Sequence, residues 1–178
     1  RARVIAGDES LARDAEDAIR GILRLPREPE AVAREAAAMR ALIAQEKGEG
    51  HALDMKLAPG ALTDLDFIAQ TLVLAHAADY PDLVGLPPCG VYEAAAAAGL
   101  LDPRDAGTLA AAHTLLSGVM HWQRLAVDGS FDPQAVPPAV LKRIATEAGM
   151  PDARRLKAHL DETRERVRAI FLRLVGSP

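Results

Sequence analysis

The feature that most constrains the fold is the stretch 67–78, in which only three residues are polar. Pro59-Gly60 turns the chain ahead of this stretch, and Thr63 is expected to begin a helix that runs to about Tyr80. A helix that is apolar almost all round must be shielded from water by other elements. We therefore expect this helix in the middle of a helical bundle.

The amino-acid composition favours helices over sheets. Hydrophobic residues make up 49% of the chain but aromatic residues only 3%, so the core must be built from Ala, Leu, Val and Ile. Such residues suit closely packed helices, whereas sheets favour β-branched and aromatic side chains. The predicted fold is all-α, with a single bundle of about seven helices in one domain over residues 1–178.

Helical periodicity, capping residues and helix breakers predict the limits of the seven helices. The first helix begins at Asp8 or Ser10 and ends near Arg24. The others cover about residues 30–47, 63–80, 91–100, 103–127, 139–148 and 153–175. Apolar and polar residues alternate at 53–57, which predicts a short extended segment between the second and third helices.

The charge pattern and the cysteine content exclude several classes of protein. The formal net charge is −4, and basic residues alternate with acidic ones, so we expect no nucleic-acid partner. No apolar run reaches the roughly 18 residues of a membrane span, and the start is too polar for a signal peptide. The single Cys89 excludes an internal disulfide and suits a reducing cytoplasm. The chain opens with Arg1 rather than Met, so we expect a piece of a longer protein.

The segment from Asp54 to Gln70 is the most informative part of the sequence. It combines an isolated Lys56, a tight turn at Gly60 and a helix start that carries Asp64 and Asp66. Lysine is scarce in this chain, with four lysines among 21 basic residues. A flexible ammonium group beside a helix N-terminus can bind a phosphate or a carboxylate.

Helix capping offers a simpler interpretation of the same residues. Thr63 and Asp66, three positions apart, resemble a capping box, and acidic residues in a first helical turn complement the helix dipole. The residue pattern alone leaves the two interpretations open.

A metal site at Asp64 and Asp66 is not expected. Two carboxylates two residues apart can share metal ions on a strand, but on a helix this step turns them roughly 200° apart. Asp66 and Gln70, four residues apart, share a face instead. His113 and His121 also share a helical face, but the sequence places no third ligand beside them.

The same segment is similar to the signature D-x-K-x-x-x-G-G-(I/L/V)-x-D-(I/L)-E-F-x-x-Q. This signature belongs to the helical domain that follows each nucleotidyltransferase core in bacterial glutamine-synthetase adenylyltransferases. The matching residues are Asp54, Lys56, Gly60, Asp64, Phe67 and Gln70. Ala61 stands at the second glycine, and Asp66 stands at the glutamate. Met39-Arg40, upstream, also resembles the family, whose relatives include uridylyltransferases with the same type of helical domain.

The resemblance implies an enzyme that transfers AMP from ATP to a tyrosine of glutamine synthetase in nitrogen regulation. Its relatives also remove this AMP with a separate N-terminal half, under the control of the PII signalling protein and glutamine. The resemblance places ATP and Mg²⁺ mainly in a nucleotidyltransferase core ahead of Arg1. This chain is then the C-terminal helical part, with no catalytic residue, cofactor or metal of its own.

The resemblance also implies roles for the matched segment. Asp54, Lys56, Gly60, Asp64, Asp66 and Gln70 are the candidate nucleotide- or core-facing residues. Lys56 is expected to meet a nucleotide phosphate or a core carboxylate, and Asp64 or Asp66 to brace a core arginine or the turn itself. The implied partners are the nucleotidyltransferase domain, glutamine synthetase and PII. The alternative is a helical regulatory or protein-interaction module without nucleotide chemistry.

Overall fold

The computed structural model describes residues 2–127, 131–132 and 135–176. Within these residues there are seven α-helices, one short 3-10 helix and no strand, so the predicted all-α fold is confirmed. The elements are α1 (Glu9–Leu23), α2 (Pro29–Lys47), α3 (Leu62–His76), η1 (Pro81–Leu83), α4 (Pro88–Ala97), α5 (Pro103–Ala126), α6 (Pro138–Glu147) and α7 (Ala153–Leu174). None of the helices that the structure describes is both long and apolar enough to cross a membrane.

Local capping chemistry explains where several helices begin. The carboxylates of Asp102 and Asp152 accept hydrogen bonds from the first-turn amides of α5 and α7, at 2.7 and 2.8 Å. Asp8 does the same for α1, and its hydrogen bonds from Ser10 and Leu11 lower the pKa of its carboxyl group. Helices α2, α4, α5 and α6 each begin with a proline, whose missing amide hydrogen costs nothing at that position.

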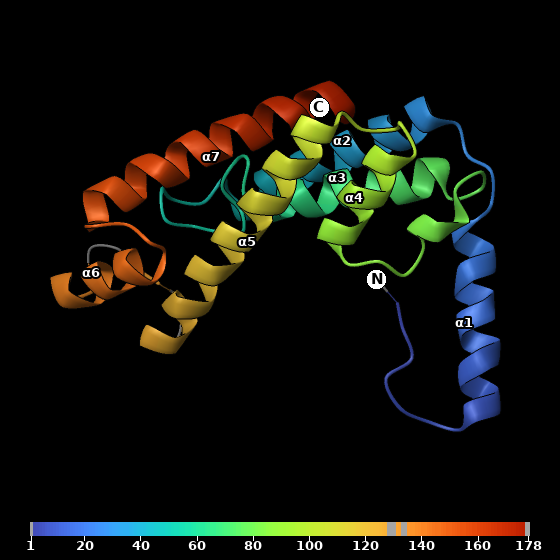
Figure 1. Ribbon diagram of the computed structural model, residues 1–178, viewed down its shortest axis with the longest axis horizontal. Helices are drawn as coiled ribbons and strands as arrows, with labels where there is room; N and C mark the ends of the chain where they lie inside the picture. Colours follow the sequence, from blue (N-terminus) through green and yellow to red (C-terminus); the bar gives the residue numbers. More distant parts are fainter. Residues whose placement is uncertain (1, 128–130, 133–134, 177–178) are drawn as a thin grey trace.

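Helix α3 lies at the centre of the packed body, as its apolar sequence predicts. Eight of its 15 residues are buried, and it contacts α2, α4, α5 and α7 (Figure 1). The buried core is largely aliphatic, with Tyr92 and Phe171 as the largest enclosed side chains. The Tyr92 hydroxyl donates a hydrogen bond to the Leu65 carbonyl at 2.8 Å, which satisfies its polar end inside the core.

Two local predictions ahead of α3 are wrong. Residues 53–57 form successive turns and not an extended segment, because the Asp54 carboxylate accepts hydrogen bonds from the Lys56 and Leu57 amides and curls the backbone. The helix begins at Leu62 with Ala61 as its N-cap, so Thr63 caps nothing. Ala61 has φ −86°, a value open to any residue, which explains why a glycine is not needed there.

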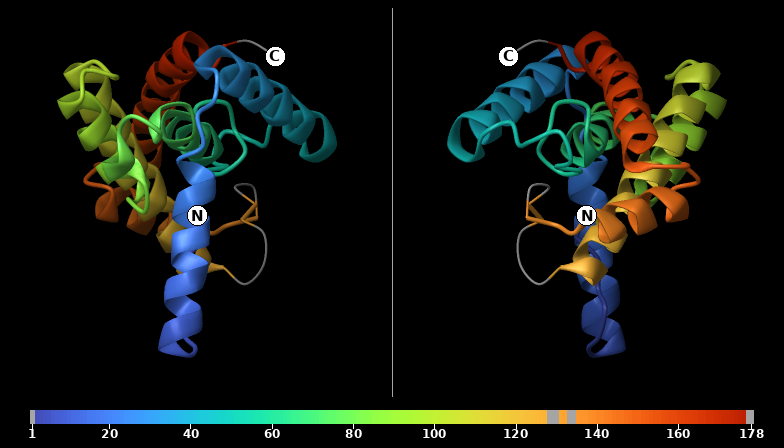
Figure 2. Two further views of the ribbon diagram at one scale, coloured as in Figure 1. Left: turned by 90° about the vertical axis from the view of Figure 1, so that its right-hand side faces the viewer. Right: turned by 90° about the vertical axis from the view of Figure 1, so that its left-hand side faces the viewer.

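Helix α1 stands apart from the other helices. It has no buried residue, and Leu11 and Ile22 on its apolar side are 68% and 60% exposed. Figures 1 and 2 show α1 extending away from the body formed by α2–α7 in every view. An isolated 15-residue helix is only marginally stable in water, and an amphipathic helix normally buries its apolar side.

Gly60 allows the turn before α3 to touch the backbone of α7. Its φ is +76°, and a Cβ placed there would lie 2.0 Å from the carbonyl oxygen of Arg164. A glycine is therefore required both by the backbone conformation and by the close approach.

We predict that Gly60→Ala lowers the free energy of unfolding by at least about 2 kcal/mol, because the strained φ and the clash with α7 add together. Gly149→Ala is the matched control, since Gly149 has φ +74° but nothing within 4 Å of its added Cβ. The control is expected to lose about 1 kcal/mol. Urea unfolding of both variants measures the difference. Equal losses would mean that α7 moves aside at little cost.

Candidate functional site

The turn that carries Lys56 is stabilised by hydrogen bonds within the turn and by a hydrogen bond from α5. The Asp54 carboxylate accepts hydrogen bonds from the amides of Lys56 and Leu57, both at 2.8 Å. The side-chain amide of Gln123, which is buried in α5, donates to the Leu53 carbonyl at 3.0 Å. These contacts fix the backbone of Lys56, while its side chain is exposed.

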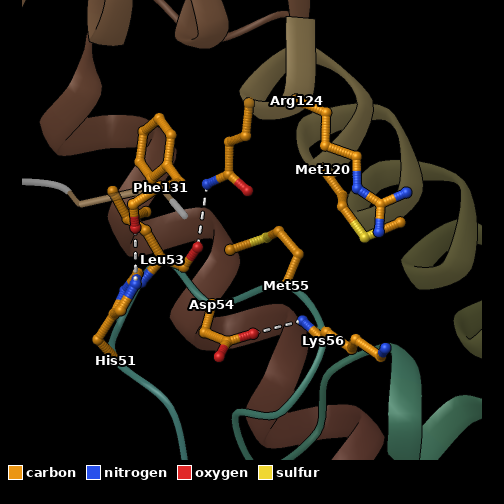
Figure 3. A pocket seen from close by; sticks show the side chains of 9 residues that line it. His51, Leu53, Asp54, Met55, Lys56, Met120, Arg124 and Phe131 are labelled. Carbon is orange, nitrogen blue, oxygen red and sulfur yellow. Dashed lines mark hydrogen bonds between the residues drawn. The ribbon is translucent and has the colours of Figure 1, made fainter. Parts of the chain in front are cut away.

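A pocket of about 230 Å³ lies between this turn and α5 (Figure 3). We call it the turn–α5 pocket. Its walls carry both charged and apolar side chains, and Phe131 closes one side. The lining residues are His51, Leu53, Asp54, Met55, Lys56, Met120, Gln123, Arg124 and Phe131.

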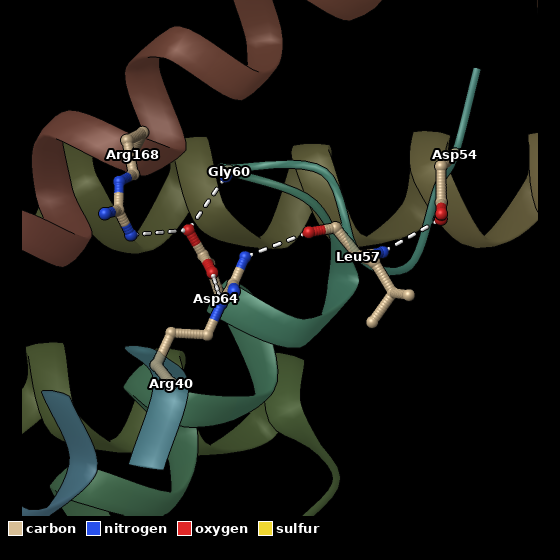
Figure 4. A network of polar contacts seen from close by, with 6 residues as sticks. All are labelled: Arg40, Asp54, Leu57, Gly60, Asp64 and Arg168. Atoms are coloured by element: carbon tan, nitrogen blue, oxygen red, sulfur yellow. Dashed lines mark hydrogen bonds and ion pairs between the residues drawn. The ribbon is translucent and has the colours of Figure 1, made fainter. Parts of the chain in front are cut away.

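On the inner side of the same turn, the Asp64 carboxylate is completely enclosed and lies between two arginines (Figure 4). Its Oδ1 accepts from Nε of Arg40 in α2 at 2.5 Å, and its Oδ2 accepts from Arg168 in α7 at 3.1 Å. Oδ2 also accepts from the Gly60 amide at 2.8 Å. Charged hydrogen bonds of this kind are stronger than neutral ones.

Arg40 extends this network to the beginning of the turn. Its Nη2 donates to the Leu57 carbonyl at 3.0 Å, and its side chain is only 6% exposed. The guanidinium of Arg168 also lies 4.8 Å from the ring centre of Phe171, a cation–π contact within α7. The network therefore joins α2, the turn, α3 and α7.

A second, larger pocket of about 640 Å³ lies between residues 49–52 and α7. It contains Asp161 and Arg164, which are ion-paired with each other. Partial burial raises the pKa of Asp161, but the hydrogen bonds and charges of Lys157 and Arg164 outweigh this effect, so the pKa lies below its ordinary value. The charges of Asp161 and Arg164 on this wall of the pocket are thus matched by each other and by Lys157.

The six candidate residues do not form one cluster. Gly60 and Asp64 belong to the enclosed network, so Asp64 braces the turn and arginines of this chain, and cannot face a partner directly. Asp54 and Lys56 line the turn–α5 pocket. Asp66 and Gln70 lie further along α3 and are half-buried.

The described residues contain no group of three or more His, Cys, Asp and Glu that could hold a metal ion. Asp64 is enclosed whereas Asp66 is half-buried, which agrees with the different directions that a helix gives to these two carboxylates.

Arg40, Arg168 and Gln123 belong to the site but were not predicted from the sequence. Arg40 and Arg168 are 24 and 104 residues away from Asp64, and Gln123 is 70 residues away from Leu53. No local pattern joins residues at such separations. The resemblance of Met39-Arg40 to the family was the one available signal, and it did not reveal the partner of Arg40.

We predict that Asp64→Asn lowers the free energy of unfolding by about 3 kcal/mol, because it leaves the buried Arg40 without its counter-charge. Glu162→Gln is the control, since Glu162 and its partner Arg166 in α7 are 64% and 65% exposed. The control is expected to lose about 0.5 kcal/mol or less. Chemical denaturation of both variants gives the comparison. A loss at Asp64 as small as that of the control would contradict a structural role for the network.

Comparison with known proteins identifies the family of the chain. The family model described as GlnD PII-uridylyltransferase matches residues 36–175, which is more than three-quarters of the chain. The "bifunctional glutamine synthetase adenylyltransferase/adenylyl-removing enzyme" of Rhodopseudomonas palustris (strain BisB5) is 40% identical over 176 residues. The enzymes of the same name from Xanthobacter autotrophicus (strain ATCC BAA-1158 / Py2) and Bradyrhizobium sp. (strain BTAi1 / ATCC BAA-1182) are 39% and 38% identical over 175 residues.

These matches cover 98–99% of this chain but only 18% of each relative, so the chain spans less than a fifth of the length of these relatives. The resemblance to glutamine-synthetase adenylyltransferases predicted from the Asp54–Gln70 segment is confirmed. The chain belongs to the GlnD PII-uridylyltransferase family and, within it, is similar along nearly its whole length to a segment of glutamine synthetase adenylyltransferase/adenylyl-removing enzymes.

Proposed function

We propose that this chain is the helical part of a bifunctional bacterial enzyme that adenylylates and deadenylylates glutamine synthetase. Its relatives carry that name, and they extend well beyond the matched segment. In this proposal the chain supports an active site that lies mainly elsewhere in the longer protein, and it is inactive alone. The observation that carries the proposal is the braced turn of the family motif, with Lys56 exposed on its outer side.

The proposal assigns the chemistry of ATP and Mg²⁺ to a nucleotidyltransferase core outside this chain. The described residues contain no group of three or more acidic, histidine or cysteine side chains that could hold a metal ion. The residues of this chain position groups at the edge of the active site. Asp54 holds the turn through two backbone amides, and Lys56 presents a positive charge to a nucleotide phosphate or to a carboxylate of the core.

The apolar side of α1 is the surface proposed to pack against that core. Leu11 and Ile22 remain well exposed, and most of the length of each relative lies outside the matched region. Burial of the apolar side of α1 by the remainder of the longer protein would remove apolar surface from water and stabilise α1. Glutamine synthetase as substrate, PII as regulator and a cytoplasmic location belong to the same proposal.

The alternative proposal is a helical regulatory or protein-interaction module without nucleotide chemistry. The exposed apolar side of α1 favours an interaction role, and both proposals account for it. The two proposals differ at Lys56, which has a role near the nucleotide only in the first.

In the longer enzyme, Lys56→Ala is expected to slow adenylyl transfer to glutamine synthetase about 10- to 100-fold, the equivalent of one lost charged hydrogen bond. Its stability should change by less than about 0.5 kcal/mol, because the side chain is exposed. Incorporation of labelled AMP into glutamine synthetase measures the rate, and urea unfolding measures the stability. Lys142→Ala, at an exposed position of α6, is the control. Unchanged turnover of the Lys56 variant would favour the interaction module.

If α1 packs against the core, its amides should exchange with solvent at different rates in this chain and in the longer enzyme. The amides of α1 should exchange rapidly in the 178-residue chain and slowly in the longer enzyme, because only the latter buries the apolar side. The double variant Leu11→Gln/Ile22→Gln should restore rapid exchange in the longer enzyme. Arg13→Gln/Asp17→Gln, on the opposite side of the helix, should not. Rapid exchange of α1 in the unmodified longer enzyme would rule out this docking.

A further inference from the structure

We propose that Lys56 and Arg124 together form a phosphate-binding site in the turn–α5 pocket, and that the site takes the polyphosphate chain of a nucleotide. Lys56 comes from the turn before α3, and Arg124 comes from the last turn of α5. Figure 3 shows both side chains reaching toward the same side of the pocket. Arg124 lies 68 positions further along the chain than Lys56, so no local sequence pattern joins the two residues.

The two cations have no anionic partner among the residues that the structure describes. Among the described residues, none forms a hydrogen bond or ion pair with the Lys56 ammonium or the Arg124 guanidinium, and both side chains are exposed. Arg143 and Arg166, by contrast, each pair with a glutamate four residues away on the same helix. Two positive groups at one pocket repel each other, and an anion between them would convert this repulsion into attraction.

Asp54 and His51, two other polar residues of the pocket, make hydrogen bonds within the chain. Asp54, the one carboxylate among the described lining residues, directs Oδ1 to two backbone amides. The Leu53 amide donates to Nδ1 of His51 at 3.1 Å, which assigns the ring hydrogen to Nε2. Nε2 then donates to the Phe131 carbonyl at 3.1 Å. With both ring nitrogens in hydrogen bonds to the backbone, His51 holds the wall together and leaves anion binding to Lys56 and Arg124.

The volume of the pocket suits the phosphate chain of a nucleotide better than the whole nucleotide. Its volume of about 230 Å³ is below the roughly 300 Å³ at which pockets begin to enclose whole drug-sized molecules. A phosphate chain therefore fits better than a complete nucleotide, and the base remains outside. Met55, Met120 and Phe131 supply the apolar parts of the pocket wall.

This arrangement predicts a specific order of affinities. Tripolyphosphate and ATP should bind most tightly, ADP more weakly, and AMP most weakly, because binding follows the number of phosphate charges. GTP should equal ATP, because no group in the pocket is assigned to the base. The identification of ATP as the natural ligand rests on the proposed function, whereas the anion site itself does not.

Arg124 also has a simpler structural role to be tested against this one. A cation in the last turn of a helix stabilises the C-terminal end of its dipole. That role predicts a small loss of stability in an Arg124 variant and no effect on phosphate binding.

The test is isothermal titration calorimetry of the 178-residue chain with sodium tripolyphosphate, ATP, GTP and AMP at low ionic strength. Lys56→Ala/Arg124→Ala should weaken tripolyphosphate binding at least about tenfold, as expected for the loss of charged hydrogen bonds. Lys56→Gln/Arg124→Gln provides a second pair that preserves side-chain bulk. Lys142→Ala/Arg154→Ala is the matched control, since it removes one exposed lysine and one exposed arginine outside the pocket. The control should change the affinity less than twofold.

Three results would overturn the proposal: no tripolyphosphate binding at millimolar concentration, an equal loss of affinity in the control, or a strong preference for ATP over GTP. Adenylyl transfer by the longer enzyme separates this failure from failure of the proposed function. If Lys56→Ala slows transfer but tripolyphosphate does not bind, Lys56 meets a carboxylate and only the phosphate site is rejected. If tripolyphosphate binds through Lys56 and Arg124 but the longer enzyme transfers no AMP, the site stands and the proposed function is rejected.

Discussion

The Asp64 carboxylate is removed from water and held by Arg40, Arg168 and the Gly60 amide, and the arrangement of α2, α3 and α7 depends on it. Bringing ionised groups into a protein interior is costly, and attraction between them offsets this cost only when the hydrogen bonds are well formed. Here both carboxylate oxygens are used, and Arg40 finds a further acceptor in the Leu57 carbonyl. An aliphatic side chain at Asp64 could fill the space, but it could not fix the direction of the turn.

The network divides the family motif into two sides. On the inner side, Gly60 lets the turn approach the backbone of α7, and Asp64 ties that turn to two helices. On the outer side, Lys56 and Asp54 line a pocket whose opposite wall is α5. A rigid inner side holds the backbone of the exposed Lys56 in place, and a side chain on a fixed backbone loses less entropy on binding a ligand than one on a mobile backbone. Residues with a purely structural role and residues suited to a ligand thus lie next to each other in sequence.

Helix α1 contrasts with this well-packed region. Helices α2 to α7 contribute buried residues to a common core, whereas α1 contributes none. Stability is therefore expected to vary along the chain, with α1 opening at a much smaller free-energy cost than α3. The chain spans less than a fifth of the length of its relatives, and an exposed apolar helix is the kind of surface that further protein can cover.

The fold class and most of the helix limits could be predicted from the sequence, although α3 ends at His76 and not near Tyr80, and α4 covers Pro88–Ala97 and not 91–100. Helix starts can be predicted because capping residues act on backbone groups only a few residues away. Asp102, Pro103 and Asp152 are examples. Helix geometry likewise predicted that the side chains of Asp64 and Asp66 point in different directions. The family motif could be recognised for the same reason, since its residues lie within one short segment.

Which side chains contact each other depends on how the helices pack, and the sequence did not predict it. The partners of Asp64 lie 24 and 104 residues away, and on its own helix each arginine looks like an ordinary surface residue. The alternation at 53–57 predicted an extended segment, but the hydrogen bonds of Asp54 produce turns instead. Arg124 and Lys56 line the same pocket only because the chain folds as it does. The exposure of the apolar side of α1 is likewise a result of how the helices pack. Pairing of distant side chains depends on how helices pack, and helical periodicity carries no information about it.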